Sequence, residues 1–421
     1  MIDPREAGLA VRERDEEWLE ILTELIRIPS ENPPGETTEI AAYLRELLTD
    51  RGVDHETVAP KPEMPNVVAQ FDGDRAVEDP PHLAFNGHLD TFPAGETDRW
   101  ERDPFAGTVE DGTVHGRGAT DMHAGFTASL AAFLYLHERR EELPGTVTLA
   151  AVSDEETGSQ WGTDYLLENY PDYRGDAVIN GEPSTTGLVR FGGRGVLWLE
   201  IDVRGASDHS AYPGGTNAIE VLTAYVDELQ DVVAEAGDVA DDLDELLAGS
   251  ADEMDRLYGE GAAELVRSAR ANLNWIEGGS QINVTPETAT GRVDIRLPLG
   301  TEGDPIVERA RQLREGFPGE ITVEVLTHTD PTYTDPDHPI LEDVCDSVAS
   351  VHGREPGLAC GLGFTDVRLY RTRGIPCAVY GPDPHNMGSQ NEYVTVEDFL
   401  DVAAVHTMAA TRYLNRSLDG A

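Results

Sequence analysis

The first half of the chain alternates short strand-like runs with helical segments, and this alternation limits the fold more than any other feature. Apolar side chains at helical spacing predict helices at 15–28, 36–51 and 123–140. Short β-like runs predict strands at 66–71, 82–90 and 146–156. This order favours an α/β fold with a mixed, largely parallel sheet flanked by helices, in which functional residues lie where strands run into loops.

The pattern changes after residue 188, where VLWLEIDVRG (196–205) alternates apolar and polar residues like a strand with one exposed face. The following residues predict a helix from Asn217, an acidic helical stretch near 235–270, strands near 281–285 and 289–297, a helix near 304–316 and a strand at 321–327. Buried-strand character returns at 375–381, and a last helix begins near Val396. We therefore expect an α+β domain inserted at 189–327, between the two parts of a first domain, 1–188 and 328–421.

Charge and composition bound the classes of protein to which the chain can belong. Its 421 residues suggest two domains, and 39% are hydrophobic, enough for ordinary globular cores. The formal net charge is -49, and Lys61 is the single lysine among 31 basic residues. Because concentrated salt screens such self-repulsion, we expect a salt-rich cytoplasm, as in halophilic archaea; a surface for a cationic partner is the alternative. Nucleic acid is not an expected partner, since no basic patch is visible.

The start of the chain and its apolar stretches bear on where the protein works. Residues 1–18 carry acids where a signal peptide would need a basic start and an apolar run. The longest apolar stretch, near 126–136, falls short of the roughly 18 residues that can span a membrane. We expect a cytoplasmic protein without a membrane span. Its 3 cysteines lack CxxC spacing, which argues against a disulfide framework or a cysteine-bound zinc.

Side chains with metal-binding chemistry follow the expected strands. His88 and Asp90 end the run 82–90 and can share one side, so that Asp90 could orient the His88 ring; a purely structural contact is the alternative. Asp121 lies among glycines just before an expected helix. Its two oxygens could bridge two cations, or the side chain could simply cap the helix.

More carboxylates follow the next strands. Asp154, Glu155 and Glu156 are adjacent and would repel one another unless a cation or protons intervened, although such a run more often lies on a solvated helix. One glutamate could bind metal while its neighbour takes a proton from water. Glu182 and His385 follow two further apolar strands. Oxygen and imidazole ligands together suit zinc, cobalt or manganese.

Five motifs follow one another along nearly the whole chain: GHLDT (87–91), GRGATDMHAG (116–125), SDEETGS (153–159), NGEPS (180–184) and HNMGSQNEY (385–393). With them the chain resembles the M20 metallopeptidase family, which includes acetylornithine deacetylase, succinyl-diaminopimelate desuccinylase, aminoacylase and glutamate carboxypeptidase. The resemblance implies a metal-binding catalytic domain at 1–188 and 328–421, and an inserted lid or dimerisation domain at 189–327.

The resemblance also implies a set of ligands for two divalent metal ions. By position, His88 and Glu182 would bind one ion, and Glu156 with His385 the other. Asp121 would bridge the two ions. Zinc is the expected metal, with cobalt or manganese as substitutes.

Further roles follow from the same resemblance. Glu155 would be the general base, and Asp90 would support a metal-binding histidine. His209, in the inserted domain, would reach the active site of a partner subunit, which implies a homodimer; a histidine satisfied by its own neighbours is the alternative. Asn283 and Arg296 would bind a substrate carboxylate, unless Arg296 is an ordinary strand arginine paired within its own strand.

The implied reaction is hydrolysis of the amide bond of an N-acyl amino acid, as in acetylornithine deacetylase or succinyl-diaminopimelate desuccinylase. A carboxypeptidase or dipeptidase acting on short peptides is the alternative, because the same metal chemistry cleaves a peptide bond. A binding protein that keeps the fold without catalysis is a remote third interpretation, since every presumed ligand is present.

Overall fold

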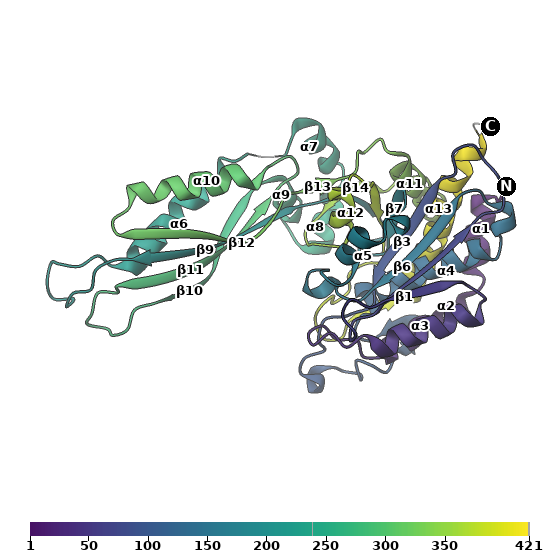
Figure 1. Cartoon of the computed structure of the whole chain (residues 1–421), viewed down its shortest axis with the longest axis horizontal. Helices are drawn as coiled ribbons and strands as arrows, with labels where there is room; N and C mark the ends of the chain where they lie inside the picture. The colour runs from purple at the N-terminus through teal and green to yellow at the C-terminus, as the bar shows by residue number, and fades with distance from the viewer. Residues whose placement is uncertain (238, 420–421) are drawn as a thin grey trace. The chain divides into compact units, whose positions relative to one another are not determined.

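The computed structural model describes residues 1–237 and 239–419. The contacts within the chain divide it into two compact units (Figure 1). The first comprises Met1–Phe191, Tyr333–Ala359 and the residues from Phe364 onward, and the second comprises Gly192–Thr332 with Cys360–Gly363. The expected limit at 327 falls inside a strand that runs to Thr329, so the second unit ends later than expected.

The first unit is built on a mixed sheet in the order β1-β2-β6-β3-β7-β15-β8-β13, with β14 beside β8. Its strands are β1 (His55–Val58), β2 (Asn66–Asp72), β3 (His82–His88), β6 (Thr146–Val152), β7 (Ala177–Asn180), β8 (Leu188–Gly193), β13 (Thr332–Tyr333), β14 (Gly357–Gly361) and β15 (Cys377–Val379). The four strands β6, β3, β7 and β15 are parallel to one another. At one edge of the sheet, β2 runs antiparallel to β6, and β1 runs antiparallel to β2. The carboxyl ends of the parallel strands therefore meet at one edge of the sheet.

Helices cover this sheet and bury its apolar residues. They are α1 (Pro4–Arg12), α2 (Asp15–Arg27), α3 (Thr38–Asp50), α4 (Gly125–His137), α5 (Thr163–Asn169), α11 (Pro339–His352), α12 (Val367–Thr372) and α13 (Val396–Asp419). Helix α4 is buried from Gly125 to Leu136, which explains why its sequence is apolar all round. The side chains of α5 and α12 pack with Ala84 and Val178 in one core cluster. A small sheet, β16-β5-β4, consists of β4 (Thr108–Glu110), β5 (Thr113–His115) and β16 (Tyr393–Thr395).

The second unit is an antiparallel four-stranded sheet in the order β10-β11-β9-β12 with helices on one face. Its elements are β9 (Gly195–Arg204), α6 (Ala218–Ala234), α7 (Asp241–Ala248), α8 (Ala251–Tyr258), α9 (Ala262–Arg267), β10 (Arg270–Gly278), β11 (Thr288–Leu297), α10 (Gly303–Leu313) and β12 (Glu320–Thr329). Along β9, Leu197, Leu199 and Ile201 are buried in the core, while Trp198 between them is exposed. This alternation is the one that the sequence predicts.

One expected element of the second unit was wrong. Residues 281–285 form a turn with one isolated bridge, not a strand, and the strand that precedes β11 in the chain and pairs with it is β10, which begins at Arg270. The reason lies in the flanking residues: Gly279 has a positive φ of 76° and Pro286 follows, so the backbone turns between them. The described part of the acidic stretch near 235–270 contains the three short helices α7, α8 and α9.

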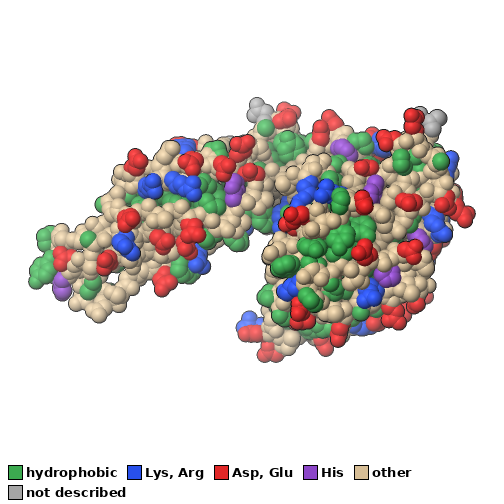
Figure 2. Space-filling view, in the orientation of Figure 1, with side chains coloured by type: hydrophobic (Ala, Val, Ile, Leu, Met, Phe, Trp, Pro, Cys, Tyr) green, Lys and Arg blue, Asp and Glu red, His purple; other side chains and the backbone are tan. Residues whose placement is uncertain are grey.

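Acidic side chains are scattered over the visible surfaces of both units and are not collected in one patch (Figure 2). This scatter agrees with a charge of -49 that is spread along the whole chain. Within residues 1–237 and 239–419, no helix is long and apolar enough to cross a membrane.

Candidate metal centre

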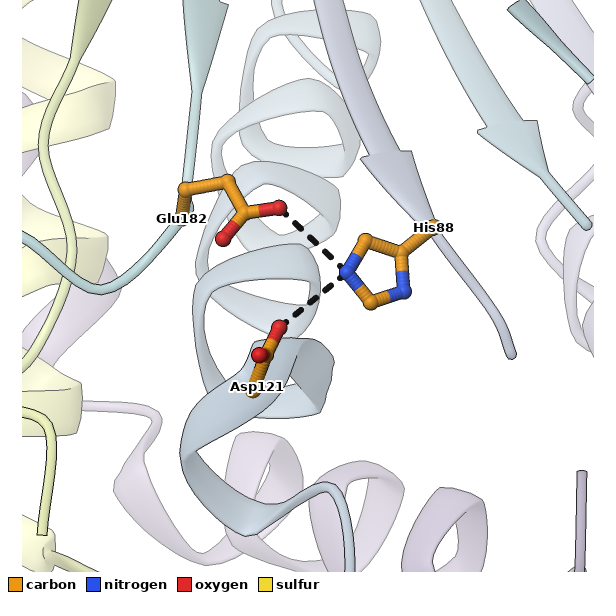
Figure 3. A group of neighbouring side chains, drawn as sticks. All are labelled: His88, Asp121 and Glu182. Carbon is orange, nitrogen blue, oxygen red and sulfur yellow. Dashed lines mark hydrogen bonds and ion pairs between the residues drawn. The ribbon is translucent and has the colours of Figure 1, made fainter. Parts of the chain in front are cut away.

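His88 lies at the end of strand β3, and two carboxylates converge on its ring (Figure 3). Its Nε2 is 3.2 Å from Asp121 Oδ1 and 3.3 Å from Glu182 Oε1. All three residues are buried. One imidazole nitrogen can share a proton with only one acceptor at a time, so two carboxylates around it indicate a site for a cation.

The two carboxylates reach His88 from different segments. Asp121 lies in the irregular turn Ala119–Ala124, between β5 and α4, and Glu182 lies just after β7. No side chain caps the start of α4. The alternative prediction, that Asp121 caps this helix, was therefore wrong. Gly125 and Gly181 pack backbone against backbone, which brings the helix start close to the segment that carries Glu182.

The three adjacent acids after β6 separate into different environments. Asp154 turns toward protein donors: its Oδ1 accepts from Thr157 Oγ1 at 2.6 Å and its Oδ2 from the Trp161 N–H at 2.8 Å. The backbone N–H groups of Glu155 and Glu156 donate to Asp90 Oδ1 and Oδ2, each at 3.2 Å. Asp154 is therefore a structural residue, and Asp90 holds the turn that presents the two glutamates.

Asp90 contacts His88 mainly through its backbone. His88 Nδ1 lies 2.8 Å from the main-chain oxygen of Asp90 and 3.6 Å from the carboxylate Oδ1. The main-chain contact is of hydrogen-bond length and, with Nδ1 protonated, leaves Nε2 free to act as a ligand.

The electrostatics of the site favour a bound cation. Burial, followed by the charge of Asp121, raises the pKa of Glu156 to about 11. Burial also raises the pKa of Glu155, with the charge of Glu182 as the next cause, and raises that of Glu182, with Asp121 next. The Oε1 atom of Glu156 is buried without a hydrogen-bond partner. Buried carboxylates this close to one another keep their protons unless a bound cation takes the place of those protons. The residues therefore fit divalent metal ions of the zinc type.

The comparison with known proteins identifies the family. The sequence matches the model of peptidase family M20/M25/M40 over residues 84–412. The chain belongs to the M20 family. It is therefore a metal-dependent hydrolase, and the cluster around His88 is its candidate metal site.

Relatives cover almost the whole chain. A probable succinyl-diaminopimelate desuccinylase of Staphylococcus epidermidis is 28% identical over 415 residues, which cover 96% of this chain and 99% of that protein. The M20 metallo-carboxypeptidase Sso-CP2 of Sulfolobus solfataricus shares the fold with a TM-score of 0.77 at 23% identity, covering 94% of this chain and 99% of its own. A dinuclear metal-binding M20 peptidase of Bacillus subtilis aligns with a TM-score of 0.69 at 18% identity, covering 96% and 99%.

The structure brings together three of the five expected ligands. Among residues 1–237 and 239–419, ligand atoms of His88, Asp121 and Glu182 lie within 4.8 Å of one another, and neither Glu156 nor His385 belongs to that group. Glu156 nevertheless interacts with this group, because the charge of Asp121, after burial, raises the pKa of Glu156. His385 lies in the loop after β15 and is half-buried. Its role as a ligand of a second ion stays a prediction.

The expected residues of the second unit lie on its own surface. His209 and Asn283 are both exposed, on neighbouring loops that join through the Ser210 N–H and the Asn283 main-chain oxygen at 3.0 Å. Arg296 forms a two-pronged ion pair with Asp294, with Nε–Oδ1 at 2.9 Å and Nη2–Oδ2 at 3.0 Å. The pairing within its own strand is thus present, and the substrate role of Arg296 stays a prediction.

Two residues of the site were missed from the sequence. Asn32 donates to Asp90 Oδ2 at 2.9 Å and to Thr157 Oγ1 at 3.0 Å, and so supports the glutamate-bearing turn. Glu392 is fully buried and accepts from the backbone of the turn that carries Asp121. In the sequence, Asn32 belongs to a proline-rich turn and Glu392 is one acidic residue among many. No local sequence signal therefore marks either of them as part of the site.

Proposed function

We propose that this M20 enzyme hydrolyses the amide bond of N-acyl amino acids, in the manner of the succinyl-diaminopimelate desuccinylase type. The observation that carries the proposal is the arrangement at one sheet edge, where Asp121 and Glu182 converge on His88 beside the turn that presents Glu155. Water activation at a metal site by a glutamate is the chemistry that such an arrangement supports. The named relative from Staphylococcus epidermidis favours an acyl amino acid as substrate.

We assign the ligands of two ions as follows. His88 and Glu182 hold one, Glu156 and His385 hold the other, and Asp121 lies between them. The Bacillus subtilis relative is a dinuclear metal-binding peptidase, which supports the count of two. Zinc is the expected ion because imidazole and carboxylate ligands suit it, with cobalt or manganese as substitutes.

The metal ions, Glu155 and Asp90 have different roles in the proposed hydrolysis. When bound, the ions would polarise the amide carbonyl and lower the pKa of a water molecule. Glu155 then takes the proton of the attacking water and delivers it to the leaving nitrogen. Asp90 accepts from the backbone N–H of Glu155 and so fixes the backbone of this residue. The Glu155 carboxylate is thereby positioned before the reaction begins.

The second unit supplies the remaining groups in this proposal. His209 reaches the active site of a partner subunit and polarises the substrate carbonyl, while Asn283 and Arg296 bind the substrate carboxylate. The exposure of His209 and Asn283 on joined loops supports this, because both side chains face solvent. Within its own loop, His209 Nδ1 accepts from the Ala211 N–H at 3.2 Å, so Nε2 is the ring nitrogen proposed to meet the substrate. The protein is therefore proposed to act as a homodimer through the inserted domain at 189–327, with 1–188 and 328–421 as the catalytic domain.

A carboxypeptidase or dipeptidase is the second candidate. The solved structure with a TM-score of 0.77 is a metallo-carboxypeptidase, and at 23% identity this likeness concerns the fold. The metal ligands are the same in both proposals, so only the substrate distinguishes them. A non-catalytic binding role is disfavoured by the retention of Glu155.

The experiment is hydrolysis of N-acetyl and N-succinyl amino acids beside dipeptides, with added Zn²⁺ or Co²⁺ in concentrated KCl. Preferential release of acetate or succinate supports the deacylase, whereas preferential dipeptide cleavage moves the protein to the peptidases. Glu155→Gln should keep its metal and lose turnover, and Glu156→Gln should weaken metal binding itself. If Glu155→Gln retains most of the activity, Glu155 is not the base.

The assay uses concentrated salt because we also propose a salt-rich cytoplasm as the setting of this enzyme. The support is compositional: a net charge of -49 with a single lysine, Lys61. High ionic strength shortens the range of repulsion among these acids.

A further inference from the structure

The small sheet β16-β5-β4 joins two segments that are far apart in the sequence. Strand β16 pairs antiparallel with β5, so that Tyr393 lies opposite His115. The turn with Asp121 follows β5 within a few residues, and the loop with His385 leads directly into β16. The pairing therefore sets two expected ligand-bearing segments side by side.

Glu392, the residue before β16, connects the His385 loop with the turn that carries Asp121. Its Oε1 accepts from the N–H groups of Thr120 at 2.8 Å and Asp121 at 3.0 Å. Its Oε2 accepts from the Gly118 N–H at 3.3 Å and forms a buried ion pair with Arg117. Both oxygens of the carboxylate are thus used on the Asp121 turn.

Tyr393 continues the connection on the other side. Its main-chain oxygen accepts from Thr120 Oγ1 at 2.9 Å. Its ring stacks on the ring of His385, with centroids 4.5 Å apart and planes 4° from parallel. Consecutive residues therefore hold the backbone of Asp121 and the imidazole of His385.

We propose that Glu392 is a positioning residue of the dinuclear centre, which sets the Asp121 turn against the His385 loop so that both can hold one ion. The proposal rests on the proposed function, in which Asp121 and His385 are ligands of the second ion. Backbone N–H groups can only donate hydrogen bonds, so the N–H groups of this turn need an acceptor at the position of Glu392. Loss of that acceptor disturbs both the Asp121 turn and the His385 loop. It therefore loosens the ion held by Glu156 and His385 more than the ion held by His88 and Glu182, which depends on Asp121 alone of the two.

The test is a Co²⁺ titration of chelator-treated, full-length protein, followed by the visible absorption of the bound ion. Glu392→Gln keeps the shape but replaces one acceptor oxygen with an amide donor. Loss of a group that supports a metal ligand costs about 10- to 100-fold in metal affinity. We expect this loss for one Co²⁺ and a smaller loss for the other, because Asp121 lies between the two ions.

Asp343→Asn is the matched control, because Asp343 is a buried carboxylate that accepts from Arg416 Nε and Nη2 at 2.8 Å outside the site. It should lower the melting temperature and leave both Co²⁺ affinities unchanged. Equal Co²⁺ affinities in wild type and Glu392→Gln would overturn the positioning role, as would an equal loss in Asp343→Asn. Wild-type protein that binds fewer than two Co²⁺ contradicts the proposed function and this role together.

Tyr393→Leu provides a second variant if Glu392→Gln does not fold. It removes the ring that stacks on His385 and keeps the backbone acceptor for Thr120. We expect weaker binding of one Co²⁺ and an altered absorption band, because the His385 ring loses its fixed orientation. Unchanged binding and an unchanged band would show that the 385–393 loop does not position this ion.

Discussion

Asp90→Asn tests how the turn with the general base is held. Asp90 is fully buried, and three donors meet its carboxylate: Asn32 Nδ2 and the Glu156 N–H at Oδ2, and the Glu155 N–H at Oδ1. Asparagine offers one acceptor oxygen, which the two donors at Oδ2 will take. The amide nitrogen then faces the Glu155 N–H, donor against donor.

The expected cost follows from these contacts. One hydrogen bond to a charged group is lost, worth about 2 kcal/mol in the free energy of unfolding. Displacement of Glu155 by about 1 Å should lower kcat by about 100-fold. Metal content should change little, because His88 meets the main-chain oxygen of Asp90, which the substitution leaves in place.

The assay combines kcat and KM on the best substrate with metal analysis and a denaturant melt. Asp366→Asn is the matched control, since Asp366 is also a buried acid near Glu155 but accepts from the hydroxyls of Ser159 and Thr163. Hydroxyl groups can reverse their donation, so this variant should keep most of its turnover. A folded Asp90→Asn enzyme with kcat within about twofold of wild type would refute the reasoning.

Three further predictions concern stability. The folded-state pKa values of Glu156 (about 11) and Glu182 are raised from the ordinary 4.5, so these two groups do not oppose folding of the metal-free protein below that pH and increasingly destabilise it as pH rises. Chelator should therefore lower the melting temperature more at pH 8 than at pH 5, and equal shifts would contradict this. Raising KCl from about 0.1 M to about 1 M shortens the screening length from about 10 Å to about 3 Å and should raise the melting temperature, whereas a flat response would argue against salt adaptation. A Cβ at Gly125 would overlap the main-chain oxygen of Gly181, so Gly125→Ala should cost about 3 kcal/mol in unfolding free energy. Gly193→Ala, which meets nothing within 4 Å, should be tolerated, and equal melts of the two variants would count against the backbone contact.

Much of the fold could be predicted because the local pattern and the tertiary environment agree. The apolar helix α4 and the strands β3 and β6 are buried on every side, and their sequences are correspondingly apolar. Strand β10 could not be predicted in the same way. It lies at an edge of its sheet with seven of its nine residues exposed, so its sequence does not carry the apolar pattern of a buried strand.

The sequence by itself determined which residues are candidates for the metal chemistry, because ligands must be particular side chains and parallel strands bring their ends to one sheet edge. His88 and Glu182 follow parallel strands, Asp121 follows a strand of the small sheet, and the three converge. Only the tertiary structure decided which acids serve the site and which serve the scaffold. Asp90 and Glu392 support the glutamate and Asp121 turns because buried backbone N–H groups there need acceptors, and those acceptors come from segments distant in the chain. A sequence shows that an acid is present, but its hydrogen-bond partners exist only once the chain has folded.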